Sequence, residues 1–237
     1  MYFDVTSKAE AFYEFQKKLD KKIYGIDENA FVDGIINFEK YSASPAKILW
    51  ILKEPNSTEG KLHWRDEIQL IPTYNGNLGA FEKTFANIVY ISHGLLNKKK
   101  WNEINWIEDE PEIVNSLEEI AFININKTPG GSKSNDNFLQ NQYQNYYKEI
   151  VREQIINFKP NIIIGGNTIK FIENDLREIY PSLKYEKHVG STNLGISISK
   201  EDNLIVFDAY HPQNTSVNRE MYCSDIIDNY LSLTQND

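Results

Sequence analysis

Four short apolar runs, each ended by polar residues, glycine or proline, constrain the fold of this chain more than any other feature. The runs are residues 47–52 (KILWIL), 119–124 (EIAFIN), 161–164 (NIII) and 204–208 (LIVFD). Nearly unbroken apolar runs of this length are typical of strands that are covered on both faces, as in a parallel sheet. We therefore predict four strands of one mostly parallel sheet.

Segments with helical periodicity separate these strands. Apolar residues recur at spacings of three and four around residues 7–25, 81–89, 138–158, 168–179 and 219–233. Strands that alternate with helices imply helices on both faces of the sheet. The turn KEDN (200–203) joins two β segments, residues 195–199 and 204–208, and predicts a hairpin. The expected fold is a single domain, residues 1–237, of the three-layer α/β/α class, with a central, mostly parallel four-stranded sheet and a β-hairpin before the last strand.

Composition limits what this chain can do. Its 237 residues contain no run approaching the ~20 apolar residues that a membrane span needs. The N-terminal segment carries charges throughout, so we expect no signal peptide and a cytoplasmic location. Cys223 is the only cysteine, which excludes an internal disulfide and a thiolate metal cluster. The net charge of −9 argues against a strongly basic nucleic-acid-binding surface.

Polar residues follow every predicted strand, at the edge where open α/β sheets bind ligands. The four exits read KEPN (53–56), NINKTPGGS (124–132), GGNT (165–168) and YHPQN (210–214). Carboxyl ends of parallel strands meet at one edge, so these exits predict a shared pocket. The stretch GGSKS lacks the spacing of a phosphate-binding loop, and we do not interpret it as one.

Three side chains at these exits have complementary chemistry. The Glu54 carboxylate can position or deprotonate water. The Asn124 amide offers both a donor and an acceptor to a base or sugar edge. His211 can donate a hydrogen bond to a developing anion. Each also has a structural interpretation, as an exposed acid, a turn cap and a turn histidine respectively.

The ordered set of exits resembles the uracil-DNA glycosylase superfamily over roughly residues 45–215. Glu54-Pro55 matches the water-positioning motif after the first strand of that family, and residues 124–130 (NINKTPG) match its base-reading asparagine followed by a lysine and a proline-glycine loop. Residues 166–168 (GNT) look like the turn after its third strand. Residues 211–213 (HPQ) are similar to its His-Pro-Ser motif.

The resemblance implies a DNA base-excision glycosylase, a hydrolase that cleaves the N-glycosidic bond of uracil or another deaminated or damaged base. Glu54 would orient the attacking water, Asn124 would read the pyrimidine edge, and His211 would stabilise the departing base anion. A flipped base also needs an aromatic neighbour, for which Trp64 and His63 are candidates. The further residues expected to contact the base are Pro55, Asn56 and Trp64, and those expected to approach DNA are Lys127, Gly130, Gly166, Thr168, Gln213 and Asn214.

The same resemblance implies DNA repair by a monomer that binds single- or double-stranded DNA and uses no cofactor and no metal. The sequence departs from the family at Leu52, where the family has glycine, and at Asn56 and Gln213. Lysines at 127, 133 and 98–100 supply local positive charge in an acidic chain.

Two alternatives remain open from the sequence. One is a non-catalytic nucleotide- or nucleobase-binding module on the same fold. The other is an unrelated flavodoxin-like or nucleoside-hydrolysing α/β protein.

Overall fold

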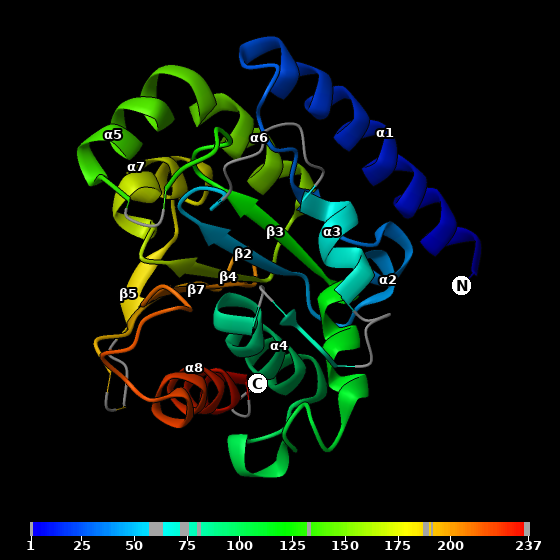
Figure 1. Ribbon diagram of the computed structural model, residues 1–237, viewed down its shortest axis with the longest axis vertical. Helices are drawn as coiled ribbons and strands as arrows, with labels where there is room; N and C mark the ends of the chain where they lie inside the picture. The colour runs from blue at the N-terminus through cyan, green and yellow to red at the C-terminus, as the bar shows by residue number, and fades with distance from the viewer. Residues whose placement is uncertain are drawn as a thin grey trace.

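The centre of the molecule is a set of four parallel strands. The computed structural model describes residues 2–56, 64–71, 76–79, 82–131, 134–186, 190 and 192–234. Its central strands lie side by side in the order β3 (Ile120–Asn124), β2 (Ile48–Leu52), β4 (Ile162–Gly166) and β7 (Leu204–Ala209), and each neighbouring pair is parallel (Figure 1). The prediction of an α/β protein with these four strands is confirmed.

The sheet is wider than predicted, because antiparallel strands extend both edges. Across the described residues it has seven strands in the order β1-β3-β2-β4-β7-β6-β5. β1 (Gly34–Ile35) pairs with β3, while β6 (Gly195–Ser199) pairs with β7 and β5 (Lys184–Glu186) pairs with β6. The predicted hairpin is confirmed, but a four-stranded sheet is wrong. β1 has two residues and β5 is exposed throughout, so neither carries the apolar run by which the central strands were found.

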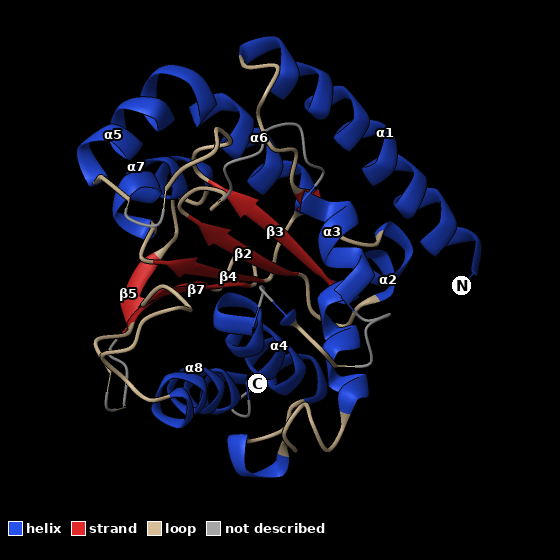
Figure 2. Ribbon diagram, in the orientation of Figure 1, coloured by secondary structure: helices blue, strands red, loops and turns tan. Residues whose placement is uncertain are grey.

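Helices cover both faces of the sheet (Figure 2). The side chains of β2 alternate between the two faces. Trp50 packs in a core with helices on one face, and its Nε1 donates to Ser92 Oγ at 3.1 Å. Leu49 and Ile51 pack in a second core on the opposite face. This double burial explains the unbroken apolar run of the first predicted strand.

Two long helices and a 3₁₀ helix cover one face of the sheet, and a larger number of helices covers the other face. The first group is α4 (Glu82–Asn97), η4 (Pro111–Glu119) and α8 (Arg219–Thr234). The second group is α1 (Tyr2–Ile26), α2 (Phe38–Ala43), α5 (Asp136–Gln142), the π-helical turn η5 (Tyr143–Tyr147), α6 (Lys148–Phe158) and α7 (Ile169–Ile179).

Two helical segments differ from expectation. The helix α3 (Trp64–Leu70), in the polar stretch after β2, lies outside the segments in which helical periodicity was found. The single helix expected over residues 138–158 is interrupted by the π turn η5, which separates α5 from α6. In the described part of the chain, no helix combines the length and the apolar character that crossing a membrane requires.

Candidate functional site

A pocket of about 400 Å³ lies beyond the carboxyl ends of the parallel strands. The pocket opens beside β2. The next strand along the chain, β3, lies on one side of β2, and the later strands β4 and β7 lie on the other side. Such a reversal of strand order is where open α/β sheets bind ligands. Glu54, Asn124 and His211 all line this one pocket. Its other lining residues are Leu52, Lys53, Pro55, Asn56, Thr84, Phe85, Phe122, Gly131, Ser134 and Gln213.

The loops after β2 and β3 continue side by side and hold Glu54 at the pocket wall. Gly130 N–H donates to the Pro55 carbonyl at 2.8 Å, and Asn126 N–H donates to the Lys53 carbonyl at 3.0 Å. Asn126 Nδ2 also donates to Glu54 Oε2 at 3.2 Å. A Cβ at Gly130 would overlap the Glu54 carboxyl group. Gly130, which was expected near DNA, therefore allows the close approach of the two loops.

Asn124 is the last residue of β3 and is only 1% exposed. Its main-chain N–H donates to Asp33 Oδ2 at 2.7 Å. The side-chain Nδ2, in contrast, has no hydrogen-bond partner among the described residues. Leaving a buried donor unpaired costs about 1–3 kcal/mol. A ligand that brings an acceptor into the pocket would recover that cost.

His211 is held as a neutral hydrogen-bond donor. Gln213 N–H donates to His211 Nδ1 at 3.2 Å, so Nδ1 keeps its lone pair and the ring proton lies on Nε2. Burial, and secondarily the nearby Lys53 ammonium, lower the pKa of His211 from 6.5 to about 4. The imidazole is therefore uncharged at neutral pH, with Nε2–H available.

The loop that carries His211 is fixed from two sides. Asn87 Nδ2 on α4 donates to the Pro212 carbonyl at 2.7 Å, and Gln213 Nε2 donates to Thr84 Oγ1 at 2.6 Å. On the sheet side, a Cβ at Gly166 would collide with Leu52 and lie 3.1 Å from Pro212 Cδ. Gly166, which was expected to approach DNA, thus makes room for this loop.

Asn214 continues the same loop. Its N–H donates to the His211 carbonyl at 2.8 Å, and its side-chain oxygen accepts from the N–H and hydroxyl of Ser216. The carboxamide thus stabilises the turn. Its expected contact with DNA stays a prediction.

The pocket is also lined by two aromatic rings that were not among the predicted site residues. Phe85 from α4 and Phe122 from β3 have ring centroids 5.4 Å apart at an interplanar angle of 35°. Phe122 precedes Asn124 by two residues, so the two share a face of the strand, a pattern readable from sequence. Trp64 begins α3, but its side chain lies outside the described residues, as does His63. Their expected roles stay predictions.

Two residues expected at phosphates are fully buried. Lys127 Nζ contacts both carboxylate oxygens of Asp33, at 2.8 and 2.9 Å. Thr168 Oγ1 donates to the Ile51 carbonyl at 2.7 Å. Neither side chain lines the pocket or reaches the surface, which corrects the exposed position expected from sequence. Among the described residues, Lys53 is instead the cation that lines the pocket, and it pairs with Asp136 at 3.0 Å.

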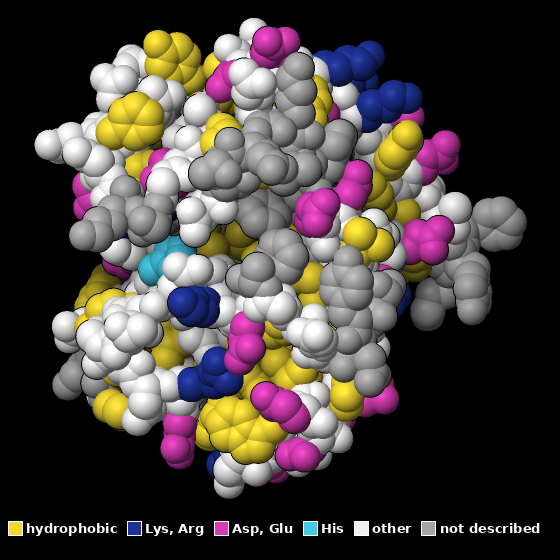
Figure 3. Space-filling model, viewed as in Figure 1, with side chains coloured by type: hydrophobic (Ala, Val, Ile, Leu, Met, Phe, Trp, Pro, Cys, Tyr) yellow, Lys and Arg dark blue, Asp and Glu magenta, His cyan; other side chains and the backbone are white. Residues whose placement is uncertain are grey.

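The lysines at 98–100 follow the end of α4 that is remote from the pocket. Phe85 lies near the start of this helix, and the intervening turns place the lysines about 20 Å away along its axis. Trp101, which follows these lysines, packs edge-on against Tyr90 and Trp106. On the molecular face in Figure 3, blue and magenta side chains are intermixed and form no continuous basic stripe.

Comparison with known proteins adds no assignment. The described side chains contain no group of three or more His, Cys, Asp or Glu residues arranged to hold a metal ion. A search of protein families finds no match to this chain, and a search of curated proteins finds none either.

Proposed function

We propose that the pocket binds a nucleobase and that the chain is an N-glycosylase of DNA, resembling the uracil-DNA glycosylase superfamily. One observation carries the proposal. A carboxylate, a buried unpaired amide and a neutral histidine donor border one pocket of about 400 Å³ that is also lined by two aromatic rings. A flat heterocycle with polar edges fits these groups, because rings stack on its faces and amides pair with its edge.

Asn124 would select the base. Its Nδ2 donates to a carbonyl of the pyrimidine edge, and its Oδ1 accepts from the adjacent ring N–H. This pairing supplies the partner that Nδ2 lacks in the unliganded protein. Phe122 and Phe85 would contact the base face in the same pocket.

Glu54 and His211 would carry the chemical step. Glu54 orients a water molecule and accepts its proton as the water oxygen bonds to the sugar C1′. The bond from C1′ to the base nitrogen breaks, and its electron pair leaves with the base as an anion. His211 Nε2–H donates a hydrogen bond to a carbonyl oxygen of that anion. A neutral donor suits this task, since it stabilises charge without surrendering its proton.

A second candidate function is nucleobase or nucleotide binding without hydrolysis. It is favoured by the net charge of −9 and by the engagement of Lys127 and Lys53 in ion pairs. A chain that wraps a DNA backbone usually offers more free positive charge near the site. A free base or nucleotide needs no such surface.

Excision assays on DNA oligonucleotides test the first function. The substrates are single- and double-stranded oligonucleotides with uracil, hypoxanthine, xanthine or a mismatch, and the product is the free base. We expect release from at least one substrate, with large losses for Asn124→Ala and His211→Ala. The matched controls are Asn157→Ala on the solvent side of α6 and His93→Ala on α4, neither of which lines the pocket.

The same panel separates the two functions. Failure of the wild-type protein on every substrate contradicts the glycosylase. If free uracil or a nucleotide then raises the melting temperature of the wild type but not of Asn124→Ala, the binding module is supported. If the wild type excises no base and also shows no thermal shift with any base or nucleotide, both functions are contradicted.

A further inference from the structure

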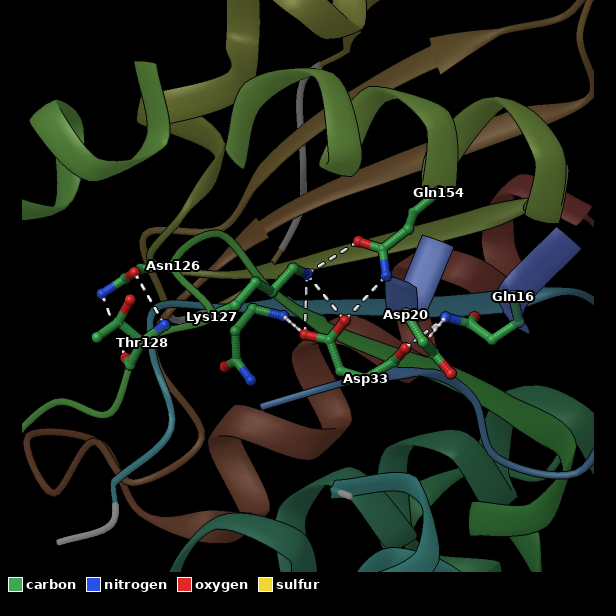
Figure 4. Close-up of polar contacts among 8 residues, drawn as sticks. Gln16, Asp20, Asp33, Asn126, Lys127, Thr128 and Gln154 are labelled. Carbon is green, nitrogen blue, oxygen red and sulfur yellow. Dashed lines mark hydrogen bonds and ion pairs between the residues drawn. The ribbon is translucent and has the colours of Figure 1, made fainter. Parts of the chain in front are cut away.

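A fully buried carboxylate that does not line the pocket contacts the main chain of Asn124. Asp33 directly precedes β1, and its side chain accepts four hydrogen bonds (Figure 4). Lys127 Nζ donates to both oxygens, at 2.8 Å to Oδ1 and 2.9 Å to Oδ2. Gln154 Nε2 donates to Oδ1 at 2.9 Å, and Asn124 N–H donates to Oδ2 at 2.7 Å.

Lys127 is the only cation in direct contact with this carboxylate among the described residues. Its three ammonium hydrogens have three acceptors, namely the two Asp33 oxygens and Gln154 Oε1 at 2.9 Å. The side chains of Asp33, Lys127 and Gln154 are 0% exposed. Buried charges are tolerated only when they are paired and fully hydrogen-bonded, as they are here.

The carboxylate takes the place of a main-chain acceptor at the edge of β3. β1 pairs with β3 only at Phe122 and Ala121, so the ladder on that edge stops before Asn124. Before β1 the chain continues beside β3, where Phe31 N–H donates to the Lys127 carbonyl at 2.8 Å. Between these contacts, the Asn124 N–H donates to Asp33 Oδ2 rather than to a main-chain carbonyl. A charged acceptor makes a stronger hydrogen bond than a carbonyl does, particularly away from water. The end of β3 is thereby fixed where the pocket begins.

We propose that Asp33 is a positioning residue for Asn124: with Lys127 and Gln154 it holds the main chain so that the Asn124 carboxamide faces the pocket. The effect on catalysis rests on the proposed function, whereas the effect on the geometry of Asn124 does not. Asp33 touches no reacting atom. It acts through the single hydrogen bond to the Asn124 N–H.

A second buried carboxylate provides the matched control. Asp175 on α7 is 2% exposed and accepts from Tyr143 Oη at 2.8 Å, from Arg152 at 2.6 Å and from Lys148 at 3.1 Å. It bonds to side chains of the outer helices and does not line the pocket. Asp175→Asn therefore makes the same chemical change at similar depth, without touching Asn124.

The experiment compares Asp33→Asn with Asp175→Asn by two readouts. ¹⁵N NMR of the free protein follows the backbone amide and the side-chain NH₂ of Asn124, including their exchange with D₂O. Kinetics on a uracil-containing single-stranded oligonucleotide give kcat and KM. Asp33→Asn leaves Lys127 without a counter-charge. The double variant Asp33→Asn/Lys127→Met removes that charge and keeps a neutral hydrogen-bond acceptor at position 33. It replaces Asp33→Asn in both measurements if Asp33→Asn does not fold.

In the Asp33 variants we expect both Asn124 signals to move, the backbone amide to exchange faster and kcat to fall about 10- to 100-fold, as a misplacement of about 1 Å can cause. Asp175→Asn is expected to leave all of these unchanged. Asn124 signals that stay in place in the folded Asp33 variants overturn the proposal, as does an equal movement in Asp175→Asn.

The two readouts keep this inference separate from the proposed function. If the wild type excises no uracil, the glycosylase on this substrate is contradicted, and NMR alone decides on Asp33. If the wild type is active, moved signals with an unchanged kcat overturn the positioning role.

Discussion

The two sides of Asn124 differ in how their polar groups are satisfied. On the inner side, Asp33, Lys127 and Gln154 exchange hydrogen bonds with one another in a space closed to solvent. On the pocket side, Asn124 Nδ2 has no partner in the described structure, and His211 offers a neutral Nε2–H. The inner side gains stability from its contacts, while the pocket side keeps unused donors.

This difference indicates where the protein gives up stability for function. An unpaired buried donor lowers the stability of the folded protein, and that free energy is recovered only when a ligand pairs with the donor. Substitutions on the inner side should therefore act first on folding, and substitutions on the pocket side should act first on ligand chemistry.

The largest stability effect is expected for Lys127→Met. This change leaves the Asp33 carboxylate buried without its cation, and breaking a buried pair in this way costs about 3–5 kcal/mol. Arg152→Met is the control, because Asp175 keeps Lys148 and Tyr143 and the lost cation is partly exposed, which limits the cost to about 1 kcal/mol. Urea denaturation measures both. Equal losses would show that the inner pair is no more critical than the outer one.

On the pocket side, His211→Gln should reduce kcat by about 10²–10³-fold, the usual cost of removing a donor to a developing oxyanion. The free energy of unfolding should change little, because the ring is partly exposed and the Gln213 N–H is its hydrogen-bond partner among the described residues. Excision kinetics and urea denaturation are measured on the same samples, with His93→Gln as the control. If His211→Gln lost much stability and kept a normal kcat, the expectation that pocket-side substitutions act first on ligand chemistry would be contradicted.

The pH dependence gives a smaller effect of known sign. The pKa of His211 is lowered by burial, and by Lys53, to about 4 in the folded protein, against 6.5 for the free side chain. Between pH 4 and 6.5 the unfolded chain binds the proton more readily, so stability should rise with pH over that range and level off above it. NMR titration of the His211 ring should show no midpoint near 6.5. His211→Gln should flatten this part of the stability profile, and an unchanged slope would contradict the assignment.

The smallest expected effect is an increase in the free energy of unfolding, which most core substitutions lower. Asn124→Leu replaces an amide whose Nδ2 is unpaired, and we expect it to raise the free energy of unfolding by about 1 kcal/mol while abolishing base binding. Asn126→Leu is the matched change, since Asn126 bonds to Glu54 and Thr128, and it should lower stability by about 1–3 kcal/mol. Thermal denaturation tests the pair. Destabilisation by both would indicate that Asn124 is already satisfied.

The central strands and the pocket-lining residues at their ends could be predicted because they depend on local sequence. An apolar run predicts a covered strand, and the polar residues after it lie at a shared edge. Glu54, Asn124 and His211 were found in this way and line one pocket. Their chemical roles stay predictions.

The inner side of the site could not be predicted. Asp33 and Lys127 are 94 residues apart, and a single sequence does not report such pairs. Lysine is rarely buried, so Lys127 was expected at the surface. β1 is too short to show strand periodicity, and α3 lies in a stretch whose polar composition indicated a loop.

The hydrogen bond that fixes the His211 tautomer comes from the main chain of residue 213. A main-chain donor is the same for every amino acid except proline. The tautomer of His211 therefore does not depend on which side chain stands at 213, although the Gln213 side chain itself fixes the loop through Thr84. A substitution at 213 would change what the loop contacts and leave the main-chain donor to His211 in place, and proline is the one residue that this arrangement forbids.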